Sequence, residues 1–84
     1  MNRLQAVSIF DEKAETFTPP CFVSALGVAT RDFASLVNDG KSMQSQFPSD
    51  FALYHLGEFD LHTGCFVPLA EPKRIVSGVD VKAK

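Results

Sequence analysis

Apolar and polar residues alternate in part over residues 4–10, which is the two-residue period of a β-strand. Other short runs of strand-forming residues predict strands at 16–18, 21–23, 51–59 and 65–69, and one more edge strand within 74–81. Pro19 and Pro20 cannot donate hydrogen bonds to a neighbouring strand, so we expect them at a turn or an edge. Pro68 is expected to end the return strand for the same reason.

The period changes between residues 25 and 38. Four apolar residues recur there at helical spacing and form one stripe: Ala29, Phe33, Leu36 and Val37. Ser24 is expected to cap the start of this helix, and Gly40 to follow its end with a positive φ. The polar residues 41–50 predict a loop.

The predicted strand 51–59 carries apolar residues on both faces, which favours a central position in the sheet. Gly57 is expected at a bulge, and residues 60–64 at a turn closed by Gly64. Together these elements predict an α+β fold, a small antiparallel sheet with one amphipathic helix packed on one face. We assign residues 1–70 to a single domain and residues 71–84 to a basic C-terminal tail that supplies the edge strand.

Composition adds a reason to expect self-association. The chain has 84 residues, of which 45% are hydrophobic and eight are phenylalanine. A domain of this size buries a smaller fraction of its surface than a large one, so its own core is thin. The surplus of apolar surface predicts a homo-oligomer.

The net charge of −2 is unevenly distributed. Residues 1–70 hold four basic residues against eight acids, and residues 71–84 hold four basic residues against two acids. Tight binding to nucleic acid needs a basic face that neutralises phosphates. Only the tail has such a surplus, and a basic terminus is more often a solubilising end.

Catalytic patterns are scarce. Cys21 and Cys65 have no metal-ligand spacing, and their apolar neighbours predict buried thiols in a reducing compartment. We expect His55 and His62 to be satisfied or surface histidines, and the acids Glu58 and Asp60 to be solvated. The sequence therefore predicts no enzyme, no cofactor and no metal site. Without an apolar run long enough for a signal peptide or a membrane span, it also predicts no membrane association.

Aromatic residues on the predicted strands offer two interpretations. Exposed rings on a sheet can stack the bases of single-stranded nucleic acid. The alternative is that most of them face the helix and form the core. Tyr54 is the best exception, because its hydroxyl needs a partner or water. The other strand aromatics are Phe10, Phe51, Phe59 and Phe66.

Four segments of the chain resemble a known family. They are SIFDEKAETFTPPCF (8–22), ATRDFASLVND (29–39), FPSDFALYHLGEFD (47–60) and TGCF (63–66). In order and spacing they are similar to the small nonstructural protein of gokushoviruses, the tailless single-stranded-DNA bacteriophages of the Microviridae. The resemblance covers residues 7–70. The chain departs from the family pattern at the helix start, where it has 26–28 (LGV) instead of an acid, and after the prolines, where Cys21-Phe22 replaces paired aromatics.

The resemblance implies a DNA-binding protein that acts in viral single-stranded DNA synthesis or packaging, in the cytoplasm of the bacterial host. We expect binding to single strands that falls steeply with salt. The residues that we assign to DNA are Arg31, Lys41, Tyr54, Lys73, Arg74, Lys82 and Lys84. The alternative for Arg31 is that it pairs with an acid. The alternative for Lys41 is that it only keeps its loop soluble. The alternative function is a protein–protein interaction module that acts on a host or phage protein through an aromatic sheet face.

Overall fold

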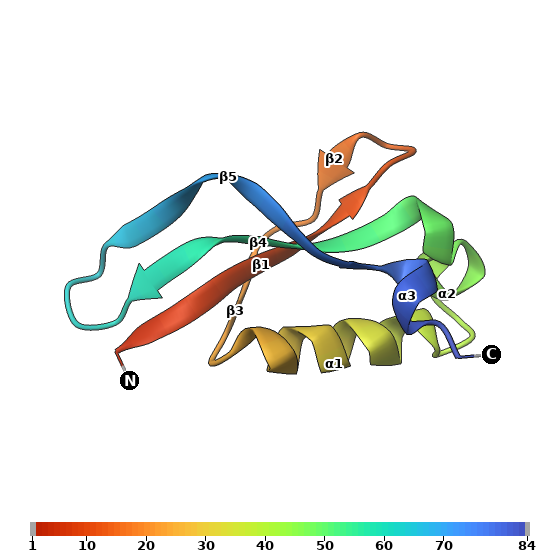
Figure 1. Ribbon diagram of the computed structural model, residues 1–84, viewed down its shortest axis with the longest axis horizontal. Coiled ribbons are helices and arrows are strands. Elements are labelled where there is room, and N and C mark those ends of the chain that lie inside the picture. The colour runs from red at the N-terminus through yellow and green to blue at the C-terminus, as the bar shows by residue number, and fades with distance from the viewer. Residues whose placement is uncertain (1, 84) are drawn as a thin grey trace.

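A twisted antiparallel sheet runs the length of the molecule, and one long helix lies along one side of it (Figure 1). The computed structural model describes residues 2–83. Its strands are β1 (Arg3–Asp11), β2 (Thr16–Phe17), β3 (Cys21–Val23), β4 (Phe51–Asp60) and β5 (Phe66–Ser77). Its helices are α1 (Leu26–Val37), α2 (Met43–Gln46), the 3-10 turn η1 (Pro48–Asp50) and α3 (Gly78–Val81). The predicted α+β fold is confirmed.

Strand β4 is central, as its two apolar faces predicted. It pairs with β1 on one side and with β5 on the other, while β2 and β3 both pair with the outer edge of β1. All pairs are antiparallel. The turn at residues 60–64 also forms as expected: Asp60 Oδ1 accepts hydrogen bonds from the amides of His62 and Thr63, and Gly64 has a φ of 75°.

The core lies between α1 and the sheet. Ala29, Phe33 and Val37 of the predicted stripe are buried, whereas Leu36 is half-buried. They pack against strand residues whose side chains point to the same side of the sheet, Val7, Phe51 and Leu53. Only two of the eight phenylalanines, Phe33 and Phe51, are buried.

Two local predictions around α1 are wrong. The N-cap is Ala25, which makes no side-chain capping bond, so Ser24 lies one residue too early for its hydroxyl to reach the first free amides. Residues 41–50 are not a plain loop, because they contain α2 and η1. Ser42 Oγ accepts a hydrogen bond from the Ser45 amide and starts α2. Gly40 has the expected positive φ of 75°.

The return strand does not end at Pro68. Strand β5 continues to Ser77, because it is an edge strand and a proline there can direct its missing donor toward solvent. Pro68 pairs with Gly57 and Lys73 pairs with His55, so the four β5 residues 69–72 lie opposite the single β4 residue Leu56. Figure 1 shows β5 arching away from β4. Residues 71–77, expected in a tail that adds an edge strand, thus belong to the strand that begins at Phe66.

Residues 81–83 are attached to the end of α1. Lys82 Nζ donates hydrogen bonds to the carbonyls of Val37 (3.1 Å) and Ser45 (3.3 Å). Asn38 Nδ2 donates to the carbonyl of Val81 at 2.9 Å, and Asn38 Oδ1 accepts from the amide of Ala83 at 2.7 Å. These bonds satisfy carbonyls that a helix end leaves free.

Gly57 marks a bulge, as predicted, and it also allows a close approach of two strands. A Cβ at this position would lie 2.5 Å from the Val67 carbonyl oxygen and 2.7 Å from Pro68 Cα. We therefore expect Gly57→Ala to lower the free energy of unfolding by about 1–3 kcal/mol in urea denaturation. Gly27→Ala is the matched control: a Cβ there meets nothing within 4 Å, and alanine in α1 should add up to about 1 kcal/mol. Equal effects of the two substitutions would contradict this explanation.

Candidate functional site

The sheet face opposite α1 carries six aromatic side chains. Directly paired residues of antiparallel strands share a face. Phe10 pairs with Phe17, Ala6 pairs with Phe22, and Phe59 pairs with both Leu4 and Phe66. None of the helices in residues 2–83 covers this side of the sheet in Figure 1. We call this surface the aromatic face; its rings are Phe10, Phe17, Phe22, Tyr54, Phe59 and Phe66.

The six rings form two clusters. In the first, ring centroids are 4.8 Å apart for Phe10 and Phe17, 5.4 Å for Phe17 and Tyr54, and 6.0 Å for Phe10 and Tyr54. In the second, the three separations among Phe22, Phe59 and Phe66 range from 4.9 to 6.0 Å. The tilted and edge-on geometries are the favourable ones for aromatic pairs. Each cluster is therefore a preformed apolar platform.

Several of these rings are open to solvent. Phe17 is 38% exposed, Phe22 41% and Phe66 64%. The interpretation that most strand aromatics form the core is thus wrong, since of the five considered only Phe51 packs against α1. Phe17 and Phe22 were not among the aromatics singled out from the sequence. The register that places them there, with Phe17 opposite Phe10 and Phe22 opposite Ala6, is set by strand pairing on either side of the proline pair and left no signal in the sequence.

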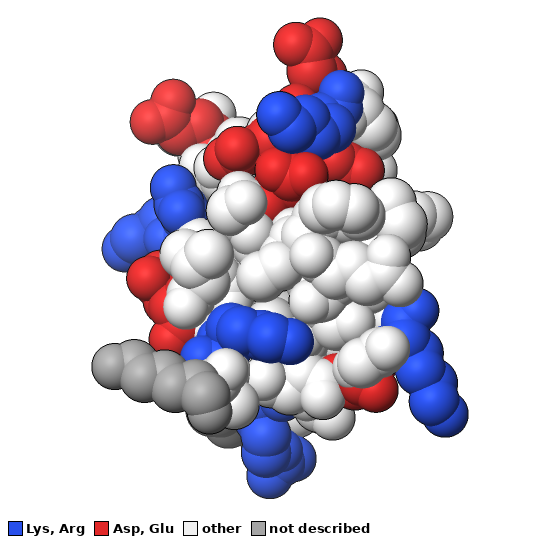
Figure 2. All heavy atoms as spheres, turned by 90° about the vertical axis from the view of Figure 1, so that its right-hand side faces the viewer, with Lys and Arg blue, Asp and Glu red and all other residues white. Residues whose placement is uncertain are grey.

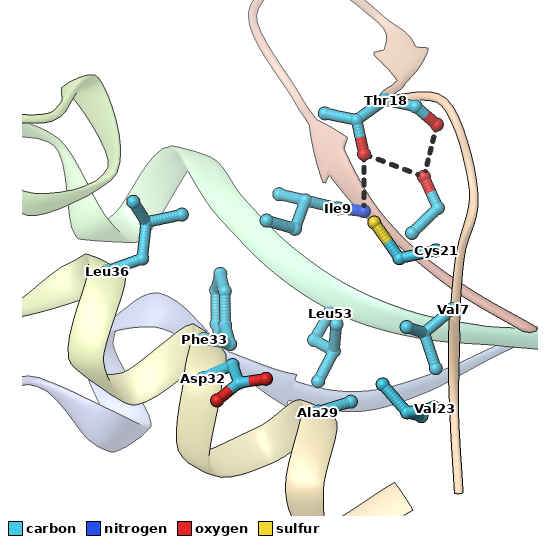
Figure 3. A pocket seen from close by; sticks show the side chains of 11 residues that line it. Val7, Ile9, Thr18, Cys21, Val23, Ala29, Asp32, Phe33, Leu36 and Leu53 are labelled. Carbon is cyan, nitrogen blue, oxygen red and sulfur yellow. Dashed lines mark hydrogen bonds between the residues drawn. The ribbon is translucent and has the colours of Figure 1, made fainter. Parts of the chain in front are cut away.

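The segment that carries Phe17 and Phe22 is held to β1 by Thr18. Thr18 Oγ1 accepts a hydrogen bond from the Ile9 amide at 3.1 Å, and Ser8 Oγ donates to the Thr18 carbonyl at 2.6 Å (Figure 3). The Thr18 amide in turn donates to the Ile9 carbonyl. These bonds fix the chain at the point where Pro19 and Pro20 interrupt the ladder. Both exposed rings are thereby placed on the same face.

The basic residues that we assigned to DNA are not gathered on one surface. Arg74 pairs with Tyr54 and therefore shares the aromatic face, whereas Lys73 pairs with His55 on the other side. Arg31 is exposed on α1, and Lys41 is exposed in the segment that follows it. Lys82 is bonded to the end of α1, and Lys84 lies outside the described residues. Among the assigned residues within 2–83, the strand pairing brings together only Tyr54 and Arg74.

The charge of Arg74 is only slightly engaged within the chain. The pKa of Asp80 is lowered mainly by a hydrogen bond from the Ser77 amide, then by the Ser77 hydroxyl, and to a smaller extent by the positive charge of Arg74. No salt bridge of Arg74 is found among residues 2–83. The guanidinium therefore remains free to contact a ligand on the aromatic face.

Two of the residues expected to be inert, Glu58 and His55, have internal partners. Glu58 accepts hydrogen bonds from Gln5 Nε2 (3.0 Å) and from Arg3 Nη1 (2.8 Å), and these bonds, in that order of weight, lower the pKa of its carboxyl group. His55 Nε2 contacts Gln5 Oε1 at 2.9 Å and the Gly57 carbonyl at 3.0 Å, which makes it a satisfied histidine. Glu58 is not simply solvated, contrary to expectation. Within residues 2–83 no group of three His, Cys, Asp or Glu side chains is placed to hold a metal ion.

A small apolar pocket opens between β1 and α1 (Figure 3). Its volume is about 170 Å³, and most of its lining side chains are apolar, among them Ile9, Phe33 and Leu53. Cys21 and Asp32 also line it without a hydrogen bond between them. Both cysteines are exposed free thiols, so the prediction that they are buried is wrong. Cys21 lies on a three-residue strand at the edge of the sheet, and Cys65 lies beside the hairpin turn.

The fold and its surface define a small α+β protein whose distinguishing feature is an uncovered aromatic sheet face. The family described as Phage ORF5 protein matches residues 4–81, and the chain belongs to this family. It is therefore a bacteriophage protein, as the resemblance implied. No curated protein and no solved structure matches the chain. None of the helices in residues 2–83 is long and apolar enough to cross a membrane.

Proposed function

We propose that this phage protein is a non-enzymatic accessory protein that binds single-stranded viral DNA through the aromatic face. In this proposal it belongs to a gokushovirus of the Microviridae and acts as a homo-oligomer in the bacterial cytoplasm, during genome synthesis or packaging. The observation that supports it is the combination of two aromatic clusters on an uncovered sheet face with Arg74 beside Tyr54. A sheet that presents aromatic rings next to a cation offers partners for both bases and phosphates.

Base stacking would supply most of the affinity. Stacking of one base on an exposed ring contributes about 1–3 kcal/mol. Tyr54 and Phe59 belong to different clusters and lie five residues apart on β4. At about 3.3 Å per residue the clusters are about 16 Å apart. One extended single strand can therefore place different bases on the two clusters, whereas the bases of a duplex are already stacked on each other.

Phosphate contacts would be few. Of the basic residues assigned to DNA within residues 2–83, Arg74 is the one that strand pairing with Tyr54 places on the aromatic face. The chain as a whole carries a negative net charge. Each phosphate contact on a single strand contributes about −0.7 to the slope of log affinity against log salt. With one such contact we therefore expect a shallow salt dependence, with a slope of about −0.7 per protomer. This replaces the steep dependence that the sequence led us to expect.

The test is a titration of a fluorescein-labelled thymidine oligonucleotide, followed by fluorescence anisotropy at low salt. Saturable binding to the single strand, with much weaker binding to a duplex of the same length, is the expected result. A folded sample, verified by circular dichroism, that leaves the anisotropy of the single strand unchanged at high protein concentration would show the proposal to be wrong.

The second candidate function is a protein-interaction module, in which the aromatic face docks onto a phage or host protein. It is favoured by the net charge of −2 and by the exposed apolar side chain of Leu61 in the hairpin turn that precedes Phe66. The charge of Arg74 separates the two functions. Arg74→Glu should weaken DNA binding but leave apolar docking intact, and Phe66→Ser should impair both. Phage yield after complementation with each variant would distinguish them.

A further inference from the structure

A second apolar surface lies at the end of the molecule where α2, η1 and α3 meet. Three side chains dominate it: Met43 is 59% exposed, Phe47 48% and Val79 54%. Figure 2 looks onto this end and shows a broad neutral area at its centre. We call it the end surface. It differs from the aromatic face, although Phe17 and Met43 both line the hollow between them.

The end surface is held in one shape by short-range bonds. The Phe47 amide donates to the Met43 carbonyl at 2.9 Å, and the Asp50 amide donates to the Phe47 carbonyl at 3.0 Å. Gly78, next to Val79, lies directly against the backbone of Pro48. The Ser77 amide and hydroxyl both donate to Asp80, which closes a capping box at the start of α3. Because these bonds fix the backbone of the patch, little backbone order has to be gained when a partner binds it.

Charges of opposite sign flank the neutral centre. Figure 2 shows acidic side chains gathered at the top, at the level of the β1–β2 turn, and mostly basic side chains around the lower half. The segment Asp11–Glu15 carries a net charge of −2, with Lys13 as its one cation. The Glu12 amide donates to the Asp50 carbonyl and ties this turn to η1. Lys41 and Lys82 lie near the opposite border, at the C-terminal end of α1.

We propose that the end surface binds a second copy of this chain in a two-fold symmetric dimer. In such a dimer the axis lies in the interface, and each subunit presents the same patch to the other. An axis that crosses the neutral centre horizontally in Figure 2 places the uncharged areas of the two copies against each other. It also brings the acidic border of each copy opposite the basic border of its partner. The charge pattern of this end is thus complementary to itself.

The size of the end surface predicts a weak dimer. The two shorter dimensions of the molecule are 24 and 17 Å, so each copy can bury about 400 Å². This is about half of the roughly 800 Å² per partner that stable interfaces bury. Dimerisation should therefore depend on concentration in the micromolar range or above. The dimer leaves both aromatic faces open, and if the proposed function is correct, one DNA strand can contact two of them with increased avidity.

Sedimentation equilibrium over a range of protein concentrations tests this dimer. The wild-type chain should change reversibly from monomer to dimer, and Val79→Asp should remain monomeric because it buries a charge in the apolar centre. Val67→Asp is the matched control, since Val67 is similarly exposed (44%) but lies in β5 near the hairpin at the other end of the sheet. It should dimerise like the wild type. A wild-type monomer at all concentrations, or loss of the dimer in Val67→Asp, would overturn the proposal.

A charge exchange tests the proposed orientation. Glu12→Lys and Lys41→Glu should each weaken the dimer severalfold, because like charges then meet across the interface. The double variant should recover most of the wild-type dissociation constant, and failure to recover would contradict the two-fold arrangement. Dimerisation is measured without DNA, so it can fail while DNA binding persists. Conversely, monomeric Val79→Asp should still bind a short oligonucleotide if the proposed function holds.

Discussion

Phe33→Ala is expected to lower the free energy of unfolding by about 3–5 kcal/mol, as measured by urea denaturation. Phe33 is 2% exposed and lies at the centre of the cluster that joins α1 to β1 and β4. Its removal leaves a cavity beside the pocket that Phe33 already lines. Small domains have total stabilities of about 5–15 kcal/mol, so this single change should leave a substantial unfolded fraction.

Phe47→Ala provides the control for this prediction. It removes the same atoms from a side chain that is 48% exposed and outside the core cluster. Its effect on the unfolding free energy should be about 1 kcal/mol or less. If the two substitutions destabilised the protein equally, the core would not be centred between α1 and the sheet. The control is measured at low protein concentration, where the proposed dimer is dissociated.

The second large effect concerns the aromatic face. If the protein binds single-stranded DNA there, Phe66→Ala should weaken binding of the oligonucleotide by about tenfold, since one stacked base contributes about 1–3 kcal/mol. Phe66 is the most exposed ring of its cluster at 64%. Adding Phe22→Ala should weaken binding further. The combined loss of affinity should be smaller than the product of the two single losses, because the ring centroids of Phe22 and Phe66 are 6.0 Å apart and the two side chains are therefore coupled.

Val67→Ala is the matched control for the stacking variants. Val67 is the next residue on β5 and pairs with Glu58, so its side chain points away from the aromatic face. The control should bind the oligonucleotide with wild-type affinity. Equal losses in Phe66→Ala and Val67→Ala would indicate a general disturbance of the hairpin. Unchanged binding in Phe66→Ala would place the DNA on another surface.

Local features of the fold were predictable because they depend on neighbouring residues. The helical stripe of Ala29, Phe33 and Val37 indicated both the helix and its buried side. The apolar residues on both faces of strand 51–59 indicated its central place in the sheet. Asp60 and Gly64 indicated the turn that joins β4 to β5. The Asp60 carboxylate can accept hydrogen bonds from turn amides, and Gly64 can adopt the positive φ that the turn requires.

Other predictions were wrong because the deciding contacts are distant in the sequence. A proline would end a central strand, but β5 has no partner within residues 2–83 on its outer edge and therefore continues past Pro68. Cys21 has apolar sequence neighbours, yet its place on a short edge strand leaves it exposed. Lys82 was assigned to a basic tail, whereas its ammonium group caps the carbonyl end of α1, 45 residues earlier.

The sequence by itself determined the main strands and the long helix, the side of that helix that is buried, and the excess of aromatic residues over what one small core can hold. These follow from periodicity and backbone chemistry, which act over a few residues. Only the tertiary structure decided which face of the sheet the helix covers and which rings stay exposed on the other. That choice depends on the path of the chain through β3 into α1 and on the register of β1 with β4, and both are set by packing between distant residues.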